Sequence, residues 1–178
     1  MEIKRKQYIV GALLALFLTG IAVSSVNSNG DQDASTSNYS SWQKIPLEDV
    51  ENEETYTVAE LEKPVLVETF AVWCPTCTRQ QRAVKDYHEE SGITSVSLDV
   101  DPNEDEQKIR KHIQQNGFDW RYSISPPEMS KMLADEYGNV MLNPPSAPMV
   151  LVCENGTRKL PTGVKPASKL KEEVNRGC

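Results

Sequence analysis

Two cysteines separated by two residues are the part of this sequence best suited to do chemistry. Cys74 and Cys77 enclose Pro75 and Thr76, directly after the apolar run of residues 65–72. Cysteines at this spacing, within one turn of a helix, can form a disulfide and open it again, which is the reaction of a dithiol oxidoreductase. The same spacing also occurs in structural disulfides and in half of a zinc site.

Other uses of a cysteine pair have less support. Covalent haem attachment is excluded because Thr78, and not a histidine, follows Cys77. A four-cysteine zinc site normally contains a second close pair, whereas Cys153 and Cys178 lie far apart in the sequence. We therefore expect no bound metal and no cofactor. The alternative that stays open is a non-catalytic module that uses the pair to hold a soft metal such as Cu(I) or Zn.

The two cysteines are expected to differ in role. If Cys74 begins a helix, the free backbone N–H groups and the helix dipole stabilise its thiolate. Cys77 then lies one turn further in and is expected to be less exposed. Cys74 is therefore predicted to attack or be attacked by a substrate sulfur, and Cys77 to resolve the mixed disulfide.

Short strand-like stretches alternate with longer helix-like stretches around this pair. The predicted strands are 65–72, 93–100, 118–124, 149–153 and 158–164, and the predicted helices are 75–90, 104–115, 127–137 and 166–176. The turn dipeptide Asn155-Gly156 indicates a hairpin between the last two strands. This order predicts one α/β domain with a mixed sheet and helices on both faces.

The N-terminus has the pattern of an export segment. Lys4, Arg5 and Lys6 precede a long uncharged apolar stretch, so residues 1–26 are predicted to be a signal-anchor or a signal peptide. Residues 27–45 are rich in Ser, Asn and Asp and are predicted to be a flexible polar linker before a domain at 46–178. We expect a single-pass protein of the cell membrane with the domain outside, or a secreted one if the segment is cleaved.

The charge balance limits the partners. The chain has 26 acidic and 19 basic residues and a net charge of −7, which argues against a nucleic-acid partner. Four cysteines in an exported chain favour disulfides. His88 and His112 fall in charged helical stretches and are expected at the solvated surface, and the chain is expected to be a monomer.

Residues 67–77, Val-Glu-Thr-Phe-Ala-Val-Trp-Cys-Pro-Thr-Cys, resemble the active-site signature of the thioredoxin superfamily. The resemblance extends from about Tyr56 to the end and includes Ala147-Pro148 before a hydrophobic strand. Residues 100–145 are longer than thioredoxin requires. With the N-terminal segment, this layout resembles the exported, membrane-anchored thiol–disulfide oxidoreductases of the TlpA type. It implies a thioredoxin fold with an extra strand and helix inserted before the cis-proline strand.

The resemblance also implies roles for single residues. Pro148 matches the family's cis-proline, which leaves the backbone of Ala147 free to pair with a substrate strand. Trp73 matches the tryptophan that shields the nucleophile Cys74. Glu68 stands where thioredoxins have a buried acid that helps to deprotonate the resolving cysteine, and burial would raise the pKa of its carboxyl.

Three further expectations depend on the same resemblance. Pro75-Thr76 replaces the usual Gly-Pro between the cysteines, which leaves the direction of electron flow open, although a hydrogen bond from Thr76 to the Cys74 thiolate would favour an oxidant. The last helix ends beside the strand 149–153, so Cys153 and Cys178 are expected to form a structural disulfide. The expected partners are protein thiols or disulfides as substrates, and a redox partner protein.

Overall fold

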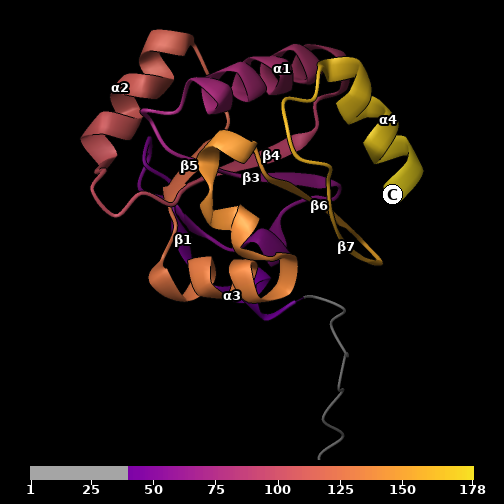
Figure 1. Ribbon diagram of the computed structural model, residues 1–178, viewed down its shortest axis with the longest axis horizontal. Helices are drawn as coiled ribbons and strands as arrows, with labels where there is room; N and C mark the ends of the chain where they lie inside the picture. The colour runs from indigo at the N-terminus through magenta and orange to yellow at the C-terminus, as the bar shows by residue number, and fades with distance from the viewer. Residues whose placement is uncertain (1–39) are drawn as a thin grey trace, which may run out of the picture. The chain divides into compact units, whose positions relative to one another are not determined.

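A computed structural model describes residues 40–178, which form a five-stranded mixed sheet in the order β5-β4-β3-β6-β7 with helices on both faces (Figure 1). The strands are β3 (Val65–Phe70), β4 (Thr94–Asp99), β5 (Arg121–Ile124), β6 (Met149–Cys153) and β7 (Gly156–Lys159). The helices are α1 (Pro75–Ser91), α2 (Glu106–Asn116), α3 (Pro127–Tyr137) and α4 (Ala167–Gly177). The predicted fold class, an α/β domain with a mixed sheet flanked by helices, is confirmed, and residues 100–145 contain α2, β5 and α3.

The predicted export segment and most of the predicted linker lie outside the described residues. Within residues 40–178, no helix has both the length and the apolar character needed to cross a membrane.

Strand β3 lies at the centre of the sheet and is buried along its whole length. It pairs in parallel with β4 and antiparallel with β6, so that Val67 lies between Val96 and Val150. Val65 and Val67 face the cluster beneath α3, whereas Leu66 faces the cluster beneath α1 and α4. A strand covered on both faces is apolar on both sides, which explains the nearly continuous hydrophobic run in the sequence.

Helix α1 follows β3 after a short connection and begins at the cysteine pair. Cys74 is its N-cap residue and Pro75 occupies its first turn, where a missing N–H costs no helical hydrogen bond. The helix ends at Gly92, which has a left-handed backbone with a φ of 60° and donates its N–H to His88 O. Helices α1, α2 and α4 cover one face of the sheet and α3 covers the other (Figure 1).

The last strand is shorter than predicted. β7 ends at Lys159, and the N–H of Leu160 makes one further bond of 2.8 Å to Met149 O. Pro161 then has no N–H to donate, so the ladder cannot continue to residue 164.

The domain also begins before residue 46. A 3-10 helix, Ser41–Lys44, precedes a small hairpin of β1 (Leu47–Glu48) and β2 (Thr55–Tyr56), none of which was predicted. Trp42 is fully buried and its Nε1 donates to Tyr137 Oη at 3.3 Å. Because residues 27–45 are mostly polar, the sequence did not indicate that Trp42 is buried. Three further 3-10 helices are Val58–Glu60, Asn139–Leu142 and Pro144–Ser146.

The expectation that both histidines lie at the solvated surface is wrong. His112 is buried, stacks on Phe70 and forms a 2.7 Å hydrogen bond with Gln81 Oε1. His88 is half-buried, and its Nε2 lies 2.8 Å from Ser95 Oγ. Each lies on the sheet-facing side of its helix, where burial lowers the pKa of the imidazole and favours the neutral ring.

Cys153 and Cys178 are joined in a disulfide, with their Cα atoms 5.4 Å apart. The bond links the end of β6 to the residue after α4. A cross-link across this sequence separation of 25 residues restricts the unfolded chain and thereby stabilises the fold.

The burial of Trp42 makes residues before 46 part of the cooperative domain. We expect Trp42→Ala to lower the free energy of unfolding by about 3–5 kcal/mol, because it leaves a large cavity in the core. Trp73→Ala is the matched control, since this side chain is 57% exposed, and it should cost less than about 1 kcal/mol. Urea unfolding of both variants measures the difference, and equal losses would contradict this boundary.

Candidate active site

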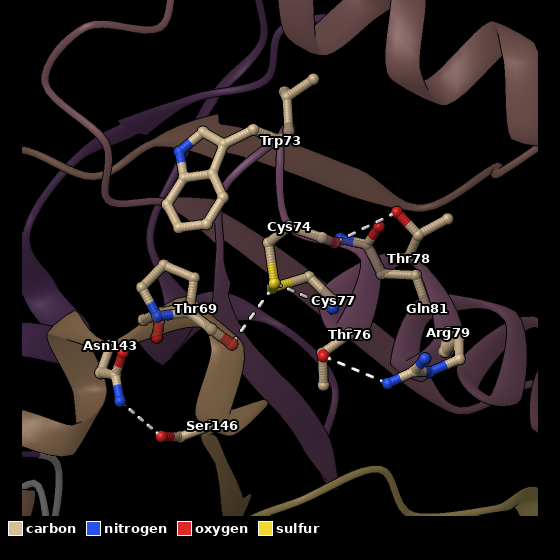
Figure 2. Close-up of a disulfide and its surroundings, with 12 residues drawn as sticks. Thr69, Trp73, Cys74, Thr76, Cys77, Thr78, Arg79, Gln81, Asn143 and Ser146 are labelled. Atoms are coloured by element: carbon tan, nitrogen blue, oxygen red, sulfur yellow. Dashed lines mark hydrogen bonds between the residues drawn. A yellow bond between two sulfur atoms is a disulfide. The ribbon is translucent and has the colours of Figure 1, made fainter.

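Cys74 and Cys77 form a disulfide at the junction of β3 and α1, with Cα atoms 5.3 Å apart (Figure 2). The backbone N–H of Cys77 points at Cys74 Sγ, 3.1 Å away, and Thr78 N donates to Cys74 O at 3.2 Å. When the disulfide is open, the N–H of Cys77 and the positive end of the helix dipole stabilise a thiolate on Cys74. The local geometry therefore makes Cys74 the better leaving and attacking sulfur.

The two cysteines do not differ in exposure as predicted. Each is 1% exposed in the disulfide state, because both belong to the apolar cluster beneath α2. Cys77 Sγ lies 3.2 Å from the carbonyl oxygen of Pro144. The Trp73 indole lies beside Cys74 (Figure 2). At 1% exposure, Cys74 becomes accessible to a substrate sulfur only after a local movement of the groups around it.

Two acidic side chains accept hydrogen bonds from the two residues before Cys74. Trp73 Nε1 donates to Asp101 Oδ2 and Val72 N donates to Glu104 Oε2, both at 2.6 Å. Asp99 is buried behind them and accepts the N–H of Asp101 at 2.9 Å. Burial, together with the nearby Glu104 and Asp101 carboxylates, raises the pKa of Asp99 to about 8. Asp99 is therefore mostly protonated near neutral pH, which limits the charge repulsion in this cluster.

Glu68 lies in the middle of β3 and is 4% exposed. Its Oε1 accepts a 2.6 Å hydrogen bond from Ser97 Oγ on β4. Burial raises the pKa of Glu68 to about 7, although hydrogen bonds from Ser97 and Gln81 and the charge of Lys165 oppose the increase. A carboxyl group with this pKa exchanges a proton readily near neutral pH.

The structure differs from the expectation for Pro148. The Ala147–Pro148 bond is trans, and Lys63–Pro64 is the one cis peptide bond in residues 40–178. Ala147 instead has a left-handed backbone, φ 44° and ψ 55°, which redirects the chain into β6 without a cis bond. Its N–H bonds to Pro144 O at 2.8 Å and its C=O accepts from Lys165 Nζ at 2.9 Å. The backbone of Ala147 is therefore not free to pair with a substrate strand in this state.

The residues between the cysteines lie at the surface of the helix start. Pro75 is exposed, and Thr76 Oγ1 accepts a 3.2 Å hydrogen bond from Arg79 Nη2 (Figure 2). The hydroxyl oxygen of Thr76 thus accepts from Arg79 in the disulfide state, and the hydrogen bond from Thr76 to a Cys74 thiolate stays a prediction for the reduced protein.

Sequence reasoning missed several residues of the site. Ser97 was visible only as a polar residue in a buried strand, at the register position opposite Glu68. Gln81 and Glu104 lie in polar stretches of helix and loop that predict solvent exposure equally well. Lys165 carries no signal in the sequence, because a single lysine before the last helix is usually a surface residue.

Comparison of the sequence with protein-family models and with curated proteins gives no match. Solved structures do match in fold. One is a secreted Mycobacterium tuberculosis disulfide oxidoreductase homologous to E. coli DsbE, with a TM-score of 0.57 and 14% identity over 78% of this chain and 99% of that one. The chain has a thioredoxin-like fold.

Two further structures have the same fold. A thiol:disulfide interchange protein of the thioredoxin family from Chlorobium tepidum TLS matches with a TM-score of 0.57 and 19% identity over 74% of this chain and 91% of that chain. A SCO1/SenC family lipoprotein from Bacillus anthracis str. Ames matches with a TM-score of 0.57 and 15% identity, again over 74% and 91%. At these identities the likeness shows the fold, and the activity must be argued from the site.

The raised pKa of Glu68 makes stability depend on pH. Between about pH 4.5 and pH 7 the native state retains a proton on Glu68 that the unfolded chain has lost, so stability falls as the pH rises through this window. Glu68→Gln removes this loss. We expect the free energy of unfolding of Glu68→Gln, minus that of the native protein, to increase by about 3 kcal/mol between pH 4.5 and pH 7.

Urea unfolding at a series of pH values from 4 to 8 measures this difference. Glu89→Gln, at an exposed position of α1, is the matched control and should follow the native curve. Parallel curves for the native protein and Glu68→Gln would show that Glu68 titrates normally.

Proposed function

We propose that this chain is an extracytoplasmic thiol–disulfide oxidoreductase that exchanges disulfides with protein substrates through Cys74 and Cys77. The observation that carries the proposal is the placement of this disulfide at the N-terminus of α1, with the buried acid Glu68 on the strand that precedes it. A purely structural disulfide does not require a helix N-terminus or a titratable acid nearby.

In the reducing direction the Cys74 thiolate attacks one sulfur of a substrate disulfide. A bond forms between Cys74 Sγ and that sulfur, the substrate S–S bond breaks, and the other substrate sulfur leaves as a thiolate. The N–H of Cys77, which points at Cys74 Sγ in the disulfide state, stabilises the attacking thiolate.

Cys77 completes the reaction. Its thiol loses a proton to the Glu68 carboxylate and attacks Cys74 Sγ, which breaks the mixed disulfide and releases the second substrate thiolate. The substrate has then gained two electrons, and the protein has lost two in forming the Cys74–Cys77 bond. A redox partner protein must reduce this bond before the next cycle.

The oxidising direction uses the same atoms in reverse. A substrate thiolate attacks Cys74 Sγ, Cys77 leaves as a thiolate, and a second substrate thiol displaces Cys74. Which direction dominates depends on the reduction potential of the pair relative to its partners.

The surface beside the disulfide suits protein substrates. Trp73 is 57% exposed and donates a hydrogen bond to Asp101. Asp101 also lines a cavity of about 580 Å³, together with Ile124 and Leu142. Ile124 and Leu142 are 41% and 44% exposed. Three large apolar side chains in this region offer contacts to the residues that flank a substrate cysteine.

An extracytoplasmic location is supported by the sequence of residues 1–26 and by the cysteine content. Membrane anchoring is the expected arrangement if the segment is retained.

The alternative function, soft-metal binding, requires side chains that can act as metal ligands around one position. In residues 40–178, no group of three or more His, Cys, Asp or Glu side chains converges on a metal position. Because two thiolates can still bind Cu(I), the reduced protein is titrated with Cu(I) beside the exchange assays. Tight copper binding without any disulfide exchange would favour the metal-binding module.

The direct test is to trap the mixed disulfide. Cys77→Ala removes the resolving thiol, so a substrate should remain attached to Cys74, and the adduct is detected by non-reducing electrophoresis and mass spectrometry. Cys74→Ala is the matched control and should trap nothing. Native protein should reduce insulin in the presence of dithiothreitol, and both variants should lose at least tenfold in rate. Adducts on Cys74→Ala would reverse the assigned roles.

A further inference from the structure

Lys165 is a buried lysine in the loop between β7 and α4. It is 4% exposed, and its Nζ donates to three carbonyl oxygens, those of Ala147 at 2.9 Å, Pro161 at 3.0 Å and Gly163 at 2.5 Å. An ammonium group has three donors, so each is satisfied. A buried lysine is uncommon because its desolvation is costly, so the contacts that it makes must offset this cost.

One of these contacts controls the turn that faces the disulfide. Pro144 O lies 3.2 Å from Cys77 Sγ, and three residues later Ala147 has a left-handed backbone. This conformation is unfavourable for a residue with a Cβ atom and persists only where neighbouring groups hold it. The Lys165 ammonium holds the Ala147 carbonyl, and Gly163 N donates to Ser146 O at 2.8 Å.

The backbone of Lys165 is tied to the helix that carries the disulfide. Gln80 is fully buried on α1, three residues after Cys77. Its Oε1 accepts the N–H of Lys165 at 2.7 Å and its Nε2 donates to the C=O at 3.1 Å. Lys165 therefore joins the helix on one side of the disulfide to the turn on the other.

The charge of Lys165 lies close to Glu68 along the sheet, because Lys165 Nζ holds the carbonyl of Ala147 and Met149, two residues later on β6, is the register partner of Glu68 on β3. Burial lowers the pKa of Lys165 to about 8, whereas the carboxylates of Glu68 and Glu173 oppose this decrease. The positive charge in turn opposes the rise in the pKa of Glu68. The other groups around Glu68 are Ser97 on β4, Gln81 on α1 and Tyr122 on β5. Of these groups, Lys165 is the one that carries a positive charge.

We propose that Lys165 is a positioning residue for disulfide exchange: its ammonium group holds the turn that faces Cys77 and supplies the positive charge that keeps Glu68 able to accept the Cys77 proton. This inference rests on the proposed function and assigns Lys165 to the resolving step. Lys165 itself touches neither sulfur in the contacts that the structure shows.

Reaction of the reduced protein with 5,5′-dithiobis(2-nitrobenzoate) separates the two steps. Attack by Cys74 releases one thionitrobenzoate, and closure by Cys77 releases the second. We expect Lys165→Met to move the pH midpoint of the second phase upward by about one unit, and to slow that phase about fivefold at pH 7, because Glu68 loses its counter-charge. Lys171→Met, an exposed lysine of α4 paired with Glu90, should leave the midpoint unchanged.

Two measurements keep the test decisive. Lys165→Gln retains N–H donors for the carbonyl oxygens but has no charge, so it should shift the midpoint as Lys165→Met does even if the methionine variant folds poorly. Titration of the Glu68 carboxyl carbon by NMR in the oxidised protein needs no turnover, and should show the same upward shift. An unchanged midpoint and an unchanged carboxyl titration would overturn the role of Lys165. A carboxyl shift without any thionitrobenzoate release would instead retain the coupling and reject the proposed function.

Discussion

The burial of strand β3 on both faces and on both edges is the constraint on which the rest of the structure depends. Its neighbours β4 and β6 occupy its edges, and the helices cover its faces. The chain that leaves β3 can therefore only turn into α1, and Cys74 is placed at the start of that helix. The same burial removes Glu68 from solvent two residues before the strand ends.

The second consequence is a separation of two kinds of disulfide. β6 runs antiparallel to β3, so the C-terminal ends of these two strands lie at opposite ends of the sheet. Cys74–Cys77 follows the end of β3, whereas Cys153–Cys178 joins the end of β6 to the C-terminus. If Cys74–Cys77 exchanges as proposed, it opens at one end of the sheet while Cys153–Cys178 continues to hold α4 at the other. This arrangement suits an oxidoreductase that must keep its fold during each redox cycle.

Sequence reasoning succeeded where one element dictates its own pattern. The apolar runs 65–72 and 149–153 predicted β3 and β6, although β3 ends two residues earlier than predicted, and the helical patterns that end before Gly92 and Gly138 predicted α1 and α3. The bounds of α3 and β6 were predicted to the residue.

Sequence reasoning failed where the environment of a residue comes from distant segments of the chain. Trp42 is buried because Tyr137, 95 residues later, packs against it. Lys165 is buried because its ammonium group donates a hydrogen bond to the carbonyl oxygen of Ala147, in another loop. The Ala147–Pro148 bond is trans and Ala147 has a left-handed backbone, whereas the resemblance to cis-proline families predicted a cis bond there. Tertiary contacts, not local patterns, therefore decide the polar part of the site.

The measurement that tests the central claim most directly is a redox titration of Cys74–Cys77 in the folded protein, with alkylation and mass spectrometry to count reduced thiols. A working exchange site should open in one two-electron step, at a potential between about −270 and −120 mV, while Cys153–Cys178 stays closed. A Cys74–Cys77 bond that resists reduction to below about −300 mV would be structural, and would contradict the proposed exchange of disulfides with substrates.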